Sequence, residues 1–305
     1  MSILNIAFWN INIAPLFYSK VDNAKMKYLY GLCNEFFTKR IVDVLILCEM
    51  NETAIEHLKR ELNGLSIVKA NDMVSKNLYF DMVMIHNHKI KILEQAPIFK
   101  KSNPSCDEGY NIKAGYSFLI SLSQNKSNDS GKINIIASHW PSIIRDNSVF
   151  KRKHAARQIK TIRDIESVKS DRQIVLMGDY NVEPTSETIK DLMYTTTNRH
   201  YAKLDGDIMY NLSESFSGPH IPNFHGVDYH FSGSWVSSDA QFRNKEESSC
   251  KNFDQVMVPS SMISNGPWII NERSSRIISN AEIKKAIKDG VIDHFPILIR
   301  IEKKR

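Results

Sequence analysis

Residues 173–181, with the sequence Q-I-V-L-M-G-D-Y-N, constrain the fold more than any other segment. The apolar run 174–177 predicts a buried strand, which ends at Gly178. Asp179 and Asn181 follow, and alternate residues that leave a strand end point in the same direction. We therefore expect a carboxylate and an amide to project together beyond a sheet edge, where they suit a divalent metal ion and a phosphate oxygen. The alternative is an ordinary turn, because G-D-x-N is also common turn chemistry.

Other strand-like segments repeat this arrangement. The apolar segments 5–10, 42–49, 133–139 and 291–297 carry polar residues at or near one end, namely Asn10, Glu49, His139 and the pair Asp293 and His294. A further segment, 253–258, opens a strand with Asp254. One strand-end carboxylate means little, but several in one chain, together with two histidines, predict a common site.

At these positions the chain resembles the endonuclease/exonuclease/phosphatase superfamily, the deoxyribonuclease-I-like proteins. The matching pieces occur in the family's order: W-N at 9–10, Glu49, S-H at 138–139, G-D-Y-N at 178–181, F-D-Q at 253–255 and D-H-F-P at 293–296. Residues 229–235 also resemble the Y-x-F-x-G-x-W segment of many bacterial members. The resemblance covers residues 3–301 and implies an α+β or α/β fold: a four-layer sandwich of two stacked mixed β-sheets flanked by helices.

The chain pattern agrees with such a fold but does not single it out. Helical spacing of apolar residues predicts helices over 22–40, 52–63 and 148–168, and another helix is expected to begin over 184–193. Strands are expected over 78–85 and 117–122. Periodicity alone does not separate stacked sheets from a doubly wound sheet. We expect residues 1–305 to form a single domain, with an insertion over 195–250, where the sequence is least family-like.

The resemblance also assigns roles to the strand-end residues. It implies that Asn10, Glu49 and Asp293 bind the metal ion, and their oxygen ligands suit Mg²⁺ or Mn²⁺. It implies that Asp179 and Asn181 position the attacking water and a phosphate oxygen. The catalytic histidines would be His139 and His294, the latter paired with Asp254, and either could serve as acid, base or phosphate donor.

Two positions depart from the family pattern. Members close to vertebrate deoxyribonuclease support the first histidine with an acid on the strand expected near 78–85. No residue there matches cleanly, although Asp81 could substitute. Gln255 stands where many relatives carry His or Arg beside the Asp.

A basic stretch follows His139 closely along the chain. Lys153, Arg157 and Lys160 share one face of the helix expected over 148–168, and Arg152 lies where relatives often carry an arginine. These four residues are candidates for binding substrate phosphates. The alternative is a solvated helix face, which is the commoner meaning of such a run.

Bulk composition limits the class of protein. The net charge of +6 and the pI of about 9.0 mildly favour a polyanionic partner. No apolar run approaches the ~20 residues of a membrane span, and the first residues predict a strand rather than a signal peptide. The four cysteines are scattered, which favours reduced thiols and a cytoplasmic location.

We therefore predict a Mg²⁺-dependent phosphodiesterase that hydrolyses nucleic acid, specifically an endonuclease acting on DNA. A phosphatase or phosphodiesterase for an inositol phosphate or a phospholipid is the first alternative, because one fold supports many substrates. A catalytically inactive binding module is the second, and the complete set of strand-end polar residues argues against it.

Overall fold

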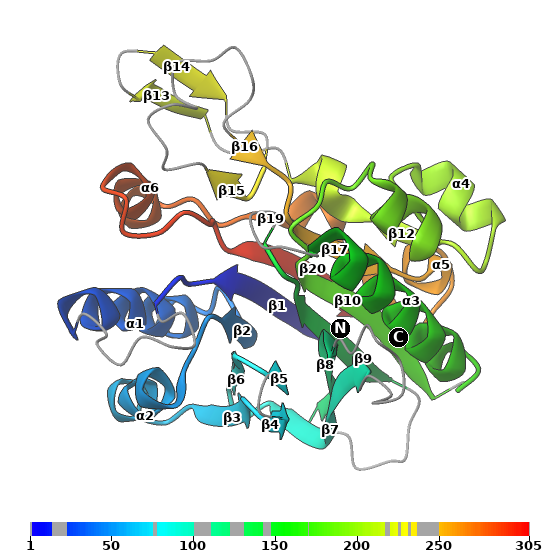
Figure 1. The fold of residues 1–305 in the computed structure, drawn as a ribbon, viewed down its shortest axis with the longest axis horizontal. Coiled ribbons are helices and arrows are strands. Elements are labelled where there is room, and N and C mark those ends of the chain that lie inside the picture. The colour runs from blue at the N-terminus through cyan, green and yellow to red at the C-terminus, as the bar shows by residue number, and fades with distance from the viewer. Residues whose placement is uncertain are drawn as a thin grey trace.

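The first β-sheet is built from β1 (Ile3–Asn10), β2 (Val44–Cys48), β3 (Ser66–Ala70), β6 (Met82–His86), β18 (Trp268–Ile270), β19 (Arg276–Ile277) and β20 (Ile297–Lys303). Its strand order is β18-β20-β1-β2-β6-β3, with β19 paired to β20. The sheet is mixed, because β1 is parallel to β2 and antiparallel to β20. Helices α1 (Asn23–Thr38) and α2 (Glu52–Glu61) lie outside it in the computed structural model (Figure 1).

The second β-sheet is also mixed. It contains β7 (Ile90–Lys100), β8 (Ile112–Leu122), β9 (Lys132–His139), β10 (Arg172–Asp179), β11 (Thr195–Thr196), β12 (Met209–Asn211) and β17 (Asp254–Val258). Its order is β11-β12-β17-β10-β9-β8-β7, in which β9 and β10 are parallel while β10 and β17 are antiparallel. The long helix α3 (Ser148–Ser167) covers its outer face. Two stacked mixed sheets with helices outside confirm the predicted four-layer fold class.

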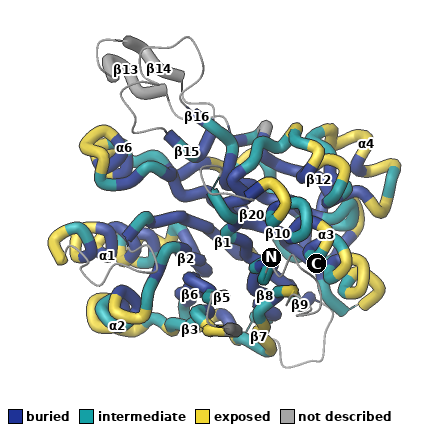
Figure 2. The backbone as a smooth tube through the Cα atoms, viewed as in Figure 1, coloured by how far each residue is buried: buried dark blue, intermediate teal, exposed yellow. Residues whose placement is uncertain are grey.

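The central strands are buried on both faces, which explains their continuous apolar sequences. In β10, Ile174 and Leu176 pack in the core beneath α3 with Ile159, whereas Val175 and Met177 belong to the larger core cluster that includes residues of both sheets. Figure 2 shows these strands as buried and gathers the exposed residues on the outer helices.

The remaining elements are short. They are the helices α4 (Arg199–Leu204), α5 (Ser260–Ile263) and α6 (Ala281–Lys288), the single turns η1 (Thr188–Leu192), η2 (Leu212–Ser215) and η4 (Glu272–Ser274), and the strand pairs β4 (Met73–Ser75) with β5 (Leu78–Tyr79), β13 (His220–Phe224) with β14 (Val227–His230), and β15 (Trp235–Val236) with β16 (Cys250–Lys251). Among the helices that the structure describes, none is long and apolar enough to cross a membrane.

The structure describes residues 2–13, 23–75, 78–100, 111–122, 131–142, 148–169, 171–216, 220–224, 227–230, 233–236 and 250–304. Parts of the predicted insertion, and two residues of the 229–235 motif, lie outside these ranges. They are residues 217–219, 225–226, 231–232 and 237–249.

Two sequence-based expectations differ from the structure. The strand expected over 78–85 is two strands, because β5 pairs with β4 whereas β6 belongs to the first sheet, and Phe80 and Asp81 lie between them. The helix expected to begin over 184–193 is only the single π-helical turn η1. Within the region 195–250, where an insertion is predicted, β11 and β12 extend the second sheet beyond β17. These strands are two and three residues long, too short for an alternating pattern to be visible in the sequence.

Gly178 allows β9 and β10 to approach closely at their ends. A Cβ atom at Gly178 would lie 2.1 Å from the carbonyl oxygen of Ser138 on β9, a backbone atom that cannot move aside without disturbing the strand. The glycine of the G-D-Y-N motif is therefore required by the spacing of the two strands that end at Asp179 and His139.

We predict that Gly178→Ala lowers the free energy of unfolding by at least about 1–3 kcal/mol, the usual cost of overpacking. Gly31→Ala is the matched control, since a Cβ at Gly31 in α1 meets nothing within 4 Å. This control should match the wild type or gain up to ~1 kcal/mol from helix propensity. Denaturant unfolding measures both, and equal stability of the two variants would contradict the close approach.

Candidate active site

Three neighbouring strands of the second sheet bring candidate residues side by side. β10 ends at Asp179, whose partners in register are His139 at the end of β9 and Asp254 at the start of β17. Because these pairs lie directly across from each other, their side chains share one edge of the sheet.

The first sheet contributes the other half of the same site. Asn10 ends β1 in register with Cys48, so Glu49 follows at the same edge. Asp293 and His294 precede β20, which pairs with the end of β1 through Ile297. The Asn10 amide links the residues of the first sheet to those of the second. Its Nδ2 atom donates to Asp179 Oδ2 at 3.2 Å and to Glu49 Oε1 at 3.3 Å. The structure thus brings together eight of the predicted residues: Asn10, Glu49, His139, Asp179, Asn181, Asp254, Asp293 and His294.

The backbone at this edge is unusual. Asn12, Glu49 and Asn181 have positive φ angles of 47°, 61° and 52°. Asparagine adopts this left-handed conformation more readily than most residues, but glutamate rarely does. Conformations of this kind concentrate at functional sites, where the surrounding structure enforces them.

His294 is held by a buried carboxylate. Its Nδ1 lies 2.7 Å from Asp254 Oδ2, and its Nε2 lies 3.9 Å from Asp179 Oδ2. The Ser234 hydroxyl also donates to Asp254 Oδ2 at 2.6 Å, and it accepts the Asp254 backbone N–H at 3.0 Å. Both His294 and Asp254 are almost fully buried, so the imidazole orientation is set by this chain of bonds.

His139 has a matching partner that the sequence did not identify securely. Asp81 Oδ2 lies 2.7 Å from His139 Nδ1, and His139 Nε2 lies 3.7 Å from Glu49 Oε1. Asp81 is in the short connection between β5 and β6, next to the end of β2. Asp81 thus occupies the supporting position for which the sequence offered no clear match.

Asp179 and Asn181 form a tight turn at the end of β10. The Asn181 backbone N–H donates to Asp179 Oδ1 at 2.9 Å, and Asn181 Nδ2 donates to the carbonyl of Trp140 at 3.0 Å. The turn explanation of G-D-x-N is therefore correct in part, and the same residues also reach the shared edge. Asp293 joins through Asn12, whose Nδ2 lies 3.2 Å from Asp293 Oδ1.

Gln255, the second departure from the family pattern, makes hydrogen bonds within the protein. It is buried and bonded to the backbone carbonyls of Val182 and Asn252, and it accepts a hydrogen bond from Asn211. Gln255 on β17 therefore connects the loop that follows Asn181 to β12 through hydrogen bonds.

Burial and crowded charges shift the proton affinities of these groups. Burial raises the pKa of Asp179 to about 6, against the opposing effect of His294. Burial lowers the pKa of His294, but Asp254, Asp293 and Asp179 outweigh burial and raise it above its ordinary value. Burial likewise opposes the charged form of His139, and Asp81 raises its pKa in spite of this. Both histidines are therefore stabilised in the protonated form by adjacent carboxylates.

The donor set fits a hard divalent cation. Ligand atoms of Asp179, Asp254 and His294 all lie within 4.8 Å of one another, and Asp254 Oδ1 is buried with no hydrogen-bond partner among the described residues. Glu49 and Asp293 add two more carboxylates. Carboxylate oxygens are common ligands of hard divalent cations in proteins. The compact group of three differs from the metal ligands expected from the sequence, Asn10, Glu49 and Asp293.

The basic residues of α3 are arranged differently from one another. Arg152 is buried and donates to the carbonyl of Pro141, so it fixes the chain that follows His139 and Trp140. Lys153 pairs with Glu187 at 2.7 Å, and Lys160 pairs with Asp164 at 2.6 Å. Arg157 is exposed.

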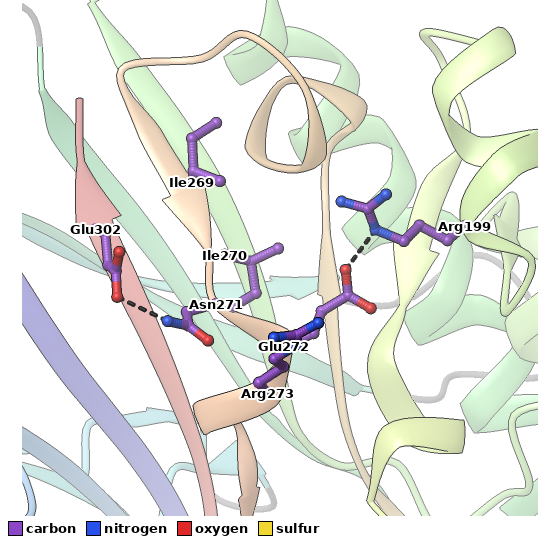
Figure 3. Close-up of a pocket in the computed structure, with 7 residues that line it drawn as sticks. All are labelled: Arg199, Ile269, Ile270, Asn271, Glu272, Arg273 and Glu302. Atoms are coloured by element: carbon purple, nitrogen blue, oxygen red, sulfur yellow. Dashed lines mark hydrogen bonds and ion pairs between the residues drawn. The ribbon is translucent and has the colours of Figure 1, made fainter.

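A separate pocket of about 490 Å³ lies at the opposite end of the first sheet (Figure 3). Its wall includes Glu302, which is in register with Ile3 at the far end of β1 from Asn10. Its acidic groups are already bonded to lining side chains, Glu272 to Arg199 and Glu302 to Asn271. We therefore place the candidate site at the shared strand-end edge rather than in this pocket.

Sequence reasoning missed three residues that hold the site together. Ser234 lies in the 229–235 motif, which resembles a family segment but suggested no function for this residue. Asn12 lies two residues beyond W-N. Lys113, the second residue of β8, contacts Asp81 Oδ1 through its Nζ at 2.6 Å, and no pattern near it marks the position.

Comparisons with known proteins identify the family and the fold of the chain. The model of the endonuclease/exonuclease/phosphatase family matches residues 120–303. A search of curated proteins finds no match to this chain. Among solved structures, D. rerio TDP2 complexed with a single-strand DNA product is similar at 16% identity and a TM-score of 0.62, covering 99% of this chain and 100% of that one.

Two further structures have similar values. The Bacteroides thetaiotaomicron mannosyl-6-phosphatase has 14% identity and a TM-score of 0.61, covering 98% of this chain and 99% of its own. The human Nocturnin catalytic domain has 13% identity and a TM-score of 0.59, covering 99% and 95% respectively. At these identities the likeness establishes the fold.

The chain belongs to the endonuclease/exonuclease/phosphatase family. Members of this superfamily are hydrolases that act on phosphoester bonds, and they generally use divalent metal ions. The family match begins at residue 120, so Asn10, Glu49 and Asp81 lie outside it and are placed by the structure alone.

We predict that Asp179→Asn stabilises the metal-free protein at pH 7.5 by about 1–3 kcal/mol, because the raised pKa of about 6 means that the buried charge is unfavourable in the folded state. That penalty disappears only well below the ordinary pKa of 3.8, where the carboxyl is protonated in both states, and it grows until the pH exceeds the folded pKa. Thermal unfolding in EDTA should therefore show the gain at pH 7.5 and lose most of it at about pH 3. An equal change at both pH values would contradict the assignment.

Proposed function

We propose that the protein is a metal-dependent phosphodiesterase that hydrolyses nucleic acid, as an endonuclease acting on DNA. The observation that carries this proposal is the pair of histidine–aspartate contacts, each 2.7 Å long, that face one carboxylate cluster from two different sheets. The family supplies the reaction class, and this arrangement supplies the groups that the reaction needs.

Phosphodiester hydrolysis requires charge neutralisation at the phosphate, a deprotonated water and a stabilised leaving oxygen. A divalent metal ion, held by Glu49 and Asp293 with Asn10 beside them, would neutralise phosphate charge when bound. Asp179 and Asn181 position the attacking water and a phosphate oxygen. The Asp179 carboxylate suits this role, because burial makes it a stronger base than an ordinary aspartate.

The two histidines hold protons at defined atoms. Asp254 and Asp81 accept from Nδ1 of His294 and His139, which leaves each Nε2 directed to the cluster. From there each imidazole can donate to a phosphate oxygen or exchange a proton with water or with the leaving oxygen. Because the imidazoles are supplied by different sheets, one can serve each side of a phosphate.

Several observations favour nucleic acid as the substrate. One structural neighbour is complexed with a single-strand DNA product, and the net charge is +6. Helix α3 starts close to His139 in the sequence, and Arg152, Lys153, Arg157 and Lys160 are proposed to bind phosphates of the polymer. Arg152 is buried and bonded to the carbonyl of Pro141, so it would have to be uncovered to do so. Lys153 and Lys160 would have to exchange acidic partners for phosphate, so Arg157, which is exposed, is the residue we expect to contribute most.

A phosphatase for a small phosphate ester is the second candidate. It is favoured by the similarity to the B. thetaiotaomicron mannosyl-6-phosphatase, whose coverage and TM-score are close to those of the DNA-bound neighbour. The same metal and histidine groups would serve a phosphomonoester, so the site alone does not separate the two.

To separate the candidates, we would incubate the protein with supercoiled plasmid, single-stranded RNA and a sugar phosphate, each with Mg²⁺, Mn²⁺ or EDTA. We expect nicked plasmid with either metal ion and none with EDTA. Glu49→Gln should need a higher Mg²⁺ concentration, and Arg157→Gln should slow plasmid cleavage but not hydrolysis of a small phosphodiester. Phosphate release from the sugar phosphate with intact plasmid would replace the nuclease proposal with the phosphatase one.

We predict that His139→Ala and His294→Ala each lower kcat by ~10²-fold or more, the range for a lost proton-transfer group. Asp81→Asn should resemble the former and Asp254→Asn the latter, because each aspartate holds Nδ1 of its histidine. Asp43→Asn is the control: Asp43 is also buried and hydrogen-bonded but lies at the opposite end of β2 from Glu49. It should cost stability and leave kcat unchanged. Wild-type kcat for Asp254→Asn would refute the pairing with His294.

A further inference from the structure

Lys113 forms the third member of a chain that ends at His139. Its Nζ lies 2.6 Å from Asp81 Oδ1, and the other oxygen of the same carboxylate, Oδ2, lies 2.7 Å from His139 Nδ1. The side chains of Lys113 and Asp81 are only 14% and 4% exposed, so water competes little for either bond. We propose that Lys113 is a positioning residue for His139, and this inference rests on the proposed catalytic role of that histidine.

The Asp81 carboxylate needs a second anchor because its backbone is not in a strand. Asp81 lies in the connection between β5 and β6, where its carbonyl accepts from Met50. A carboxylate bonded on one oxygen alone can turn about its Cβ–Cγ bond. An ammonium on the other oxygen fixes the carboxylate plane, and with it the direction of the His139 imidazole.

The other histidine has an equivalent anchor of a different kind. Asp254 belongs to strand β17, and its second donor is the neutral hydroxyl of Ser234. Both aspartates therefore have one donor besides the histidine, but only Asp81 has a charged one. The charged donor is found on the aspartate whose backbone is less constrained. Asp254 belongs to a strand that is paired with its neighbours, whereas Asp81 lies in a connection between two strands.

Lys113 itself is well placed for this task. It lies near the start of β8, in register with Phe99 of β7, so its Cα position is set by the pairing of these two long strands. Its Nζ also lies over the ring of Phe80, 5.9 Å from the centroid, and Phe80 is fully buried. A cation held by a carboxylate and an aromatic face has little freedom to leave the pair.

The first test does not depend on activity. The ring N–H proton of His139, assigned by its loss in His139→Ala, is followed by NMR for its exchange with water. We expect slow exchange in the wild type and in Lys113→Arg, which keeps the charge, and exchange at least ~10-fold faster in Lys113→Met. Lys132→Met is the matched control, because Lys132 forms a similar 2.7 Å pair with Asp171 at the far end of β9 from His139. It should leave the exchange rate unchanged.

The second test is kinetic. Lys113→Met should lower kcat by ~10-fold with KM altered less than ~2-fold, which is the lower range for losing a residue that orients an active-site ligand. Lys113→Arg should recover most of the loss. In a His139→Ala background Lys113→Met should cause no further loss, since a residue that acts through His139 has nothing left to act on.

The outcomes separate the two levels of the proposal. Unchanged N–H exchange in Lys113→Met, or an undiminished kcat loss in the His139→Ala background, overturns the role of Lys113. Faster exchange in a protein that hydrolyses no phosphoester supports the positioning of His139 by Lys113 and overturns the proposed function instead. Should Lys113→Met fail to fold, Lys113→Gln, whose amide can still donate to Asp81, takes its place with an intermediate exchange rate expected.

Discussion

The hydrogen bond from Asn10 Nδ2 to Asp179 Oδ2 joins the two sheets at the edge where the polar residues gather. Each sheet supplies an incomplete set: Glu49, Asp81, Asp293 and His294 come from the first, and His139, Asp179 and Asp254 from the second. Five carboxylates in so small a region would repel each other, and the protein offsets this with two imidazoles, two amides and one ammonium. The geometry of the site therefore depends on how the sheets are stacked, and the core between them holds that stacking.

Much of this arrangement could be predicted from the sequence, because the strands concerned are buried on both faces. Continuous apolar runs such as 174–177 can be recognised in the sequence without knowledge of the strands that pair with them. The polar residue that ends each run can be recognised in the same way. Parallel pairing of β1 with β2 and of β9 with β10 brings the ends of these strands to one edge, and the antiparallel strands β17 and β20 begin at that edge. The eight residues lie together for this reason, while their catalytic and metal-binding roles remain proposals.

The parts that escaped prediction have a common physical cause. Asp81 stands in a break between two strands, and Lys113 reaches it across 32 positions of sequence, so neither leaves a local pattern. The strands β11 and β12 are two and three residues long and looked like part of a loop. The four basic residues of α3 looked equivalent in the sequence, but burial of Arg152 and acidic partners for Lys153 and Lys160 distinguish them. The burial of Arg152 and the pairing of Lys153 with Glu187 come from tertiary contacts, which local sequence patterns do not encode, whereas Lys160 and Asp164 form an i,i+4 pair within the helix.

The position of β20 has a consequence for how the site is assembled. This strand follows Asp293 and His294 and is inserted between β18 and β1, inside the first sheet rather than at its edge. Until it is inserted, β1 has an open edge and His294 is absent from the side of Asp254. All residues of the site precede β20 in the chain, and Asp293 and His294 come directly before it. The site is therefore complete only when β20 pairs with β1 and β18, and a chain in which this strand is unpaired lacks one of the two imidazoles at the site.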